Sequence, residues 1–209
     1  QTISLPHPPS GQDLTYSSVW AQSNRKRLRL AAKFQGDNDE LMHLLDTNLE
    51  TAKLNRYNLE VLQSIAKICR QNLAFLQRFG RIDELFLAAD SASRGRDAKR
   101  VLDAIDEALE LVLELRRERN RIFQDVVKVW YQSWHPRVAE ANGRRFVHDL
   151  DDVKDHVPDR TIDMSYLLYR QLQLPLETWF TQVQLSRNSF AEKHTLPKRQ
   201  AELDWKGLE

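Results

Sequence analysis

The chain has 209 residues, of which 31 are basic, 30 are acidic and 41% are hydrophobic. This composition is typical of a globular domain that can bury a sizeable core, and it excludes wholesale disorder. A net charge near zero gives no reason to expect nucleic acid as a partner, and no apolar run is long enough to suggest membrane insertion.

Residues 1–15 are predicted to form an extended linker, because Pro6, Pro8 and Pro9 remove backbone donors and disfavour a helix. A helical pattern follows from Tyr16 to Phe34, and Gly36 with Asp37 is expected to end it. The start QTISLPHPPSGQDL lacks both a methionine and the pattern of a signal peptide. We therefore expect a fragment or a processed product of a longer protein.

The clearest pattern lies between residues 37 and 79, where apolar residues recur every three or four positions without a proline or glycine. It predicts one helix about 60 Å long that ends at Gly80, followed by a shorter helix around 82–92 and a turn in the stretch SASRGRD, residues 91–97. The pattern has one gap, near Arg56. Its members are Leu41, Leu45, Leu49, Ala52, Leu59, Leu62, Ile65, Cys69, Leu73 and Leu76, and the lone cysteine is interpreted as a small core residue.

A second long helical pattern runs from Asp97 to Pro136. Because two such helices need partners for their apolar stripes, we expect an all-α fold: an elongated helical bundle built on two long antiparallel helices with shorter flanking helices. No strand-like alternation of any length is visible. One bundle domain is expected over residues 16–195, with an irregular elbow near 136–163 and a tail over 196–209.

The elbow is expected to begin as a helix that breaks or bends at Asn142-Gly143. Its acids and histidines recur four apart, which on a helix would place ligands for a divalent metal on one face. Those ligands would be His148, Asp152, Asp155 and His156, helped by Asp159 or Asp163. The alternative, which we favour, is a polar bend whose carboxylates are neutralised by Arg144, Arg145, Lys154 and Arg160. No cofactor is expected.

Aromatic residues cluster just before the elbow, in the stretch VWYQSWHPR. Exposed, they could stack on a sugar ring or a partner protein; buried, they would fill the junction between the long helix and the elbow, which is the commoner role of such residues. The candidate contact residues are Trp130, Tyr131, Trp134, His135, Arg137 and Arg144. The basic segment 24–33 is interpreted as charged helix surface rather than a phosphate site.

The stretch of residues 55–175, which includes SWHPRVAEANGR and DDVKDHVPDR, resembles the helical C-terminal region of large bacterial glycoside hydrolases of the family-20, β-N-acetylhexosaminidase-like group. In that family a TIM-barrel catalytic domain would precede the helices, and catalysis uses an adjacent Asp-Glu pair at the end of a barrel strand. Asp83-Glu84 and Asp106-Glu107 match only as dipeptides within helical patterns. No catalytic residue is therefore carried over.

The resemblance implies a non-catalytic accessory domain of a larger carbohydrate-active enzyme, periplasmic or secreted. Its partner would be the catalytic domain of the same parent polypeptide, and a homo-oligomer is possible. The alternative is a stand-alone helical protein–protein interaction module, which a broad exposed apolar stripe on the long helices would favour. A third possibility is a metal-dependent enzyme that uses the acidic elbow.

Overall fold

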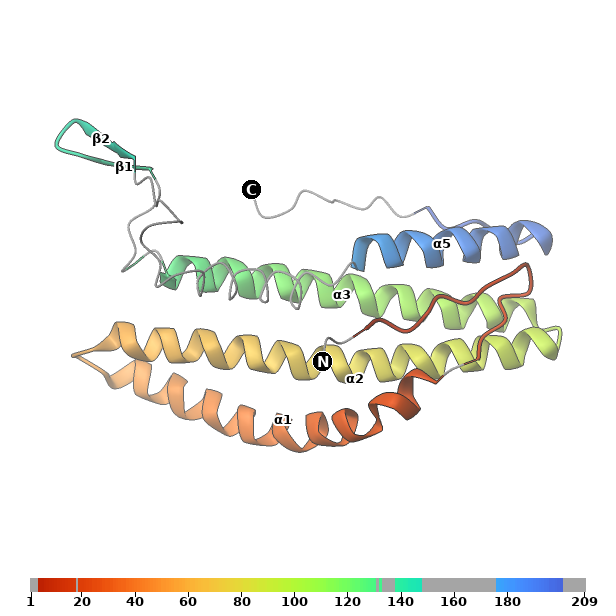
Figure 1. The fold of residues 1–209 in the computed structure, drawn as a ribbon, viewed down its shortest axis with the longest axis horizontal. Coiled ribbons are helices and arrows are strands. Elements are labelled where there is room, and N and C mark those ends of the chain that lie inside the picture. The colour runs from red at the N-terminus through yellow and green to blue at the C-terminus, as the bar shows by residue number, and fades with distance from the viewer. Residues whose placement is uncertain (1–3, 18, 131, 133–137, 148–175, 201–209) are drawn as a thin grey trace.

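The fold is a bundle of antiparallel helices, shown by a computed structural model that describes residues 4–17, 19–130, 132, 138–147 and 176–200 (Figure 1). Helix α1 spans Trp20–Thr51, α2 spans Arg56–Arg94, α3 spans Ala98–Trp130 and α5 spans Leu176–Lys193. Helix α2 lies between α1 and α3, and α5 packs on α3. The predicted all-α bundle is confirmed, with three long helices in place of two.

The turn between α1 and α2 lies at residues 52–55, where the apolar pattern had its gap. Gly36 and Gly80, expected to end helices, lie inside α1 and α2. A glycine within a helix costs only about 1 kcal/mol, so packing overrides it. Asn55 supplies the turn with φ of 54°, and the Arg56 guanidinium donates a 2.6 Å hydrogen bond to the Leu49 carbonyl at the end of α1.

The turn between α2 and α3 lies where the sequence predicted it. Arg96 has φ of 58°, and the Asp97 carboxylate accepts a 3.1 Å hydrogen bond from the Arg100 backbone N–H, which caps α3. The second long pattern begins here as expected. Its first residues, Val101, Leu102 and Ile105, are buried.

Residues 138–147 form a β-hairpin and not the expected helix. Strand β1 (Val138–Ala141) pairs antiparallel with β2 (Arg144–Val147), in the register Val138 opposite Val147. Asn142 and Gly143 both have positive φ, at 54° and 70°, as a two-residue type I′ turn requires. The prediction of no strands is therefore wrong here, although the fold as a whole remains helical.

The main core lies at one end of the bundle, which we call the packed end (residues 4–20, 75–115 and 176–200). Phe79 packs edge-on against Trp20 with ring centroids 6.1 Å apart, and Phe86 stacks on Trp179 at 5.7 Å. The largest fully buried side chains are Phe75, Phe79, Phe86, Phe180, Leu14, Ile82, Ile105, Leu109, Leu115, Leu176, Val101 and Val112.

The N-terminal segment was expected to be an extended linker, but residues 11–14 form a turn closed by a bridge between Ser10 and Thr15. The segment also lies against the helices rather than leading away from them. The indole N–H of Trp179 donates to the Pro6 carbonyl at 2.6 Å, and that of Trp20 donates to the Ser4 carbonyl at 2.7 Å. Leu14 is fully buried. This segment therefore forms part of the packed end.

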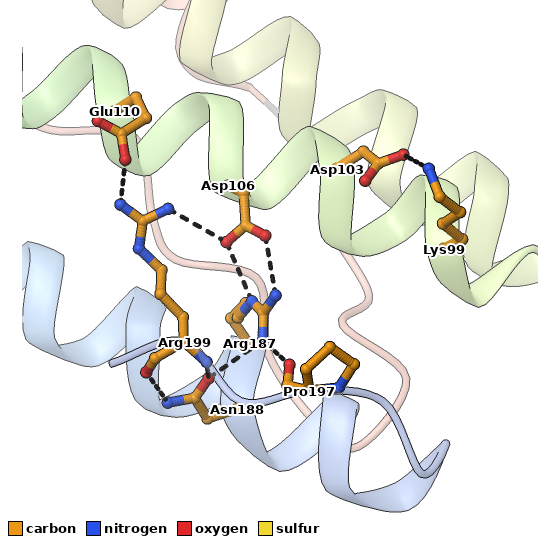
Figure 2. A network of polar contacts seen from close by, with 8 residues as sticks. All are labelled: Lys99, Asp103, Asp106, Glu110, Arg187, Asn188, Pro197 and Arg199. Carbon is orange, nitrogen blue, oxygen red and sulfur yellow. Dashed lines mark hydrogen bonds and ion pairs between the residues drawn. The ribbon is translucent and has the colours of Figure 1, made fainter. Parts of the chain in front are cut away.

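A polar network joins α3, α5 and the residues that follow α5 (Figure 2). The Arg187 guanidinium forms two hydrogen bonds with the Asp106 carboxylate, at 3.0 and 2.8 Å, and donates to the Pro197 carbonyl at 2.6 Å. Arg199 pairs with Glu110 and with Asp106. The segment predicted as a tail is therefore held on the bundle as far as it is described, up to residue 200.

The opposite end, which we call the thin end (residues 38–51 of α1 and 56–70 of α2), has a small core. Met42, Leu45 and Ala66 are its buried cluster, with Leu59 packed against them. Polar contacts add to it: the Asn38 amide donates to the Ala66 carbonyl at 3.1 Å, and Arg70 pairs with Asp39 at 3.0 Å. At this end, α1 and α2 therefore bury few apolar side chains against each other.

Candidate functional site

The sequence-predicted contact residues lie largely outside the described residues. Trp130 is the last residue of α3, and Arg144 is the first residue of β2, where it is exposed. The other contact candidates (Tyr131, Trp134, His135 and Arg137) and the metal candidates (His148, Asp152, Asp155 and His156) lie outside the described residues. In the described chain, no three histidine, cysteine or acidic side chains are grouped so that they could hold a metal.

The Asp83-Glu84 and Asp106-Glu107 dipeptides are engaged in contacts within the bundle. Asp83 accepts a 2.6 Å hydrogen bond from the Tyr16 hydroxyl, and Asp106 pairs with Arg187. Glu84 and Glu107 both pair with Arg81. As expected, both dipeptides lie within helices. Their carboxylates stabilise the bundle.

A polar depression of about 560 Å³ lies at the packed end, between the N-terminal segment and the ends of α2 and α5. Several of its charged groups are paired within the protein. Asp13 pairs with Lys193 at 2.5 Å, which lowers the pKa of that carboxyl, and Asp90 pairs with Arg94 at 2.8 Å. Asp90 also accepts a hydrogen bond from the Tyr16 backbone N–H at 3.1 Å. These contacts fasten the N-terminal segment.

The more informative surface is an open groove between α1 and α2. It has a volume of about 400 Å³ and is far more apolar than the depression at the packed end. We call it the α1–α2 groove. Its lining residues are Phe34, Asp37, Asn38, Leu41, Cys69, Asn72 and Leu73. Cys69, interpreted from the sequence as a core residue, is exposed here, because no further helix among the described elements covers this face of α2.

Further large apolar side chains are exposed on the two helices that form the groove. Phe34, Leu41 and Leu44 of α1 are 45%, 46% and 59% exposed, and Leu62 and Ile65 of α2 are 52% and 53% exposed. Leu62, Ile65 and Cys69 are three or four residues apart, so they share one face of α2. Single exposed apolar residues are ordinary, but a contiguous set on two adjacent helices marks an interaction surface.

Charge is sharply divided along α1. Every lysine and arginine of this helix lies before Gly36, and every acidic residue lies after it. The basic residues are Arg25, Lys26, Arg27, Arg29 and Lys33; the acidic residues are Asp37, Asp39, Glu40, Asp46 and Glu50. The apolar groove therefore begins where the sign of the charge changes.

Sequence reasoning named Leu41, Leu62 and Ile65 but assigned them to the core. A signal for the groove was present, because residues 41–45 of α1 include four large apolar side chains. They cover more of the helix surface than one neighbouring helix can bury. Met42 and Leu45 face α2, and Leu41 and Leu44 remain exposed.

The chain matches no protein-family model, no curated protein and no solved structure. The resemblance to family-20 glycoside hydrolases, the accessory role and the periplasmic or secreted location therefore stay predictions. Among the helices that the structure describes, none is both long and apolar enough to cross a membrane.

Proposed function

We propose that the chain is a helical protein–protein interaction module that binds along the α1–α2 groove. The observation that carries the proposal is an apolar groove lined by Phe34 and Leu41, together with the exposure of Leu44, Leu62 and Ile65 on the same two adjacent helices. Burying such side chains against a partner removes apolar area from water and stabilises a complex by about 25 cal/mol per Å² before the costs of association.

A helix is the partner shape that suits this surface. The groove lies between two long antiparallel helices, and a third helix could lay an apolar stripe into it. The polar side chains of Asp37 and Asn72 lie among the apolar ones and can orient the partner. Recognition would combine an apolar centre with a polar rim, as is usual for interfaces.

Cys69 allows a direct test, because it is the chain's single cysteine and it lines the groove. We expect a maleimide to react with Cys69 several-fold more slowly in the cells that naturally make the protein than in the purified chain at nanomolar concentration. Leu41→Asp should remove this protection, whereas Leu185→Asp, which changes an exposed leucine of α5, should not. Equal rates of labelling in cells and in dilute solution would refute the proposal.

A further inference from the structure

The occupant of the groove can be inferred from the charges of α1. The order of those charges does not favour the helix itself, because the helix dipole favours acidic residues at the N-terminus and basic residues at the C-terminus. Helix α1 has no acidic residue in its first turn and no basic residue in its last turn. The division of charge must therefore be explained by something other than the stability of the isolated helix.

Contacts within the chain account for only part of it: Asp39 pairs with Arg70 of α2, and Asp46 accepts a hydrogen bond from Gln63. Among the described residues, no ion pair involves Arg29, Lys33, Asp37 or Glu40, and all four side chains are exposed. Lys33 lies over the ring of Phe34 at 5.7 Å, which leaves its ammonium group at the surface. Both halves of the pattern are thus available to another molecule.

The exposed face of α1 also has the spacing of a helix–helix interface. Steps of four and three residues alternate along it, which is the repeat that keeps one seam facing a partner helix. The seam residues are Leu30, Phe34, Asp37, Leu41, Leu44 and Asn48; Leu30 is half-buried and the others are exposed. The buried positions Ala31, Asn38, Met42, Leu45 and Leu49 form a separate face toward α2.

We propose that the partner is a second copy of this chain, with its α1 packed antiparallel on this seam. The inference rests on the proposed function and adds the identity of the partner. In this arrangement the basic half of each α1 lies beside the acidic half of the other. The two-fold axis repeats this contact, so the charges of both halves are paired with opposite charges. The apolar seam lies at the centre, and the α1–α2 pairs of the two copies cover each other's grooves.

The charges select this orientation over the alternative. Parallel pairing would place Arg29 and Lys33 beside the same residues of the second copy, and Asp37 and Glu40 likewise. Like charges at such positions destabilise helix pairing, whereas opposite charges favour it. A self-complementary pattern on one helix is what an antiparallel homodimer needs.

Charge reversal tests the proposal with the full chain, kept reduced so that Cys69 cannot form a disulfide. One variant combines Arg29→Glu with Lys33→Glu, and the other combines Asp37→Lys with Glu40→Lys. The wild-type chain should sediment as a dimer that weakens with added salt, and each variant alone should dimerise about tenfold more weakly or worse. Mixing the two variants should restore the dimer, because opposite charges then face each other along the whole seam.

The matched control reverses Arg121 and Lys128 to glutamate, both exposed on α3, and should leave the dimer unchanged. Circular dichroism checks that the variants remain helical. The inference would be overturned if the wild-type chain were monomeric up to about 100 µM. This range covers the micromolar dissociation constants of weak but specific pairs. Dimers that ignore both reversals, or variants that stay monomeric when mixed, would also overturn the inference.

Labelling of Cys69 separates this inference from the proposed function. Protection that rises with the concentration of the purified chain supports both. Protection in the native cells combined with a monomeric purified chain leaves the interaction module standing and overturns the homodimer. Free reaction of Cys69 in both settings overturns both.

Discussion

At the packed end, Phe75, Phe79 and Phe86 of α2 are fully buried, because the N-terminal segment, α3 and α5 surround this half of the helix. At the thin end, Leu62 and Ile65 of the same helix are about half exposed. There α1 and α3 cover two sides of α2, with α3 held by contacts such as the 3.5 Å ion pair between Lys67 and Asp125. Both ends of α2 are apolar, but they differ in how many elements cover them.

The comparison shows that one apolar pattern can serve two purposes. At the packed end it supplies the free energy that holds the domain together. At the thin end, part of it is left on the surface, and no helix among the described residues covers it there. Natural proteins rarely leave contiguous apolar surface of this kind without a use. The packed end therefore carries the stability of the domain, and the thin end carries the proposed interaction.

The largest expected effect comes from truncating an aromatic ring at the packed end. Phe79→Ala should lower the free energy of unfolding by about 3–5 kcal/mol, since Phe79 is fully buried against Trp20 and Phe75. Met42→Ala, at the thin end, should lower the free energy of unfolding by about 2 kcal/mol. This is a small loss for a change of methionine to alanine, because the buried cluster around Met42 has few members. Urea denaturation measures both; equal losses would contradict the division into two ends.

A second test compares ion pairs at the two ends. Arg187→Met should lower the free energy of unfolding by about 1.5–3 kcal/mol, because it removes charge-assisted hydrogen bonds to Asp106 and a donor to the Pro197 carbonyl. Arg70→Met, at the thin end, removes an exposed pair with Asp39 and should cost less than about 1 kcal/mol. Thermal unfolding of both variants checks the ranking, and a larger loss for Arg70→Met would reverse it.

The helical class was predictable from the spacing of apolar residues, but the helix ends were not. Gly36 and Gly80 were interpreted as breaks, and both lie within helices because tertiary packing outweighs the small cost of a helical glycine. The true turn uses Asn55, a residue that adopts the left-handed conformation without looking like a strong break in the sequence. The Asn142-Gly143 hairpin was predictable from its turn residues and was missed.

The sequence predicts which residues of the groove are apolar, but not that they are exposed. Periodicity showed that Leu41, Leu62, Ile65 and Cys69 belong to apolar helix faces, but it cannot show how many helices cover each face. Coverage depends on where the N-terminal segment and α5 pack, and both pack at the other end. Exposure at the thin end is therefore a property of the tertiary fold.

The two helical glycines offer a third way to sharpen the comparison. A Cβ at Gly80 would lie 3.1 Å from Cδ2 of Leu28, whereas a Cβ at Gly36 would meet nothing within 4 Å. We expect Gly80→Val to cost about 1–3 kcal/mol by forcing α1 and α2 apart, and Gly36→Val to change the free energy of unfolding by less than about 0.5 kcal/mol. Chemical denaturation of the two variants gives the difference; similar values would mean that α1 is free to shift at Gly80.

The smallest expected effect concerns pH and the attachment of α5. Arg119 and Arg116 of α3 contact the Glu177 carboxylate at 2.9 and 3.3 Å. Burial alone would raise the pKa of this carboxyl, but hydrogen bonds from its own backbone N–H and from Arg119 outweigh burial and hold the pKa below the usual 4.5. A carboxyl with a lowered pKa in the folded state contributes stability above the unfolded value, and this contribution is lost as pH falls through the folded value.

Glu177→Gln should therefore destabilise the protein modestly at pH 7, and its difference from wild type should shrink once the pH falls below about 4.5. Hydrogen exchange of residues 176–193, followed by mass spectrometry, locates the effect. The exchange of α5 should quicken in the variant at pH 7, while the reactivity of Cys69 at the thin end stays unchanged. A difference that persists undiminished at pH 3 would show that Glu177 acts through its shape and not its charge. Helix α5 makes its main helix contacts with α3 and not with the groove. A change in the reactivity of Cys69 in the Glu177→Gln variant would therefore show that the two ends of the bundle are coupled.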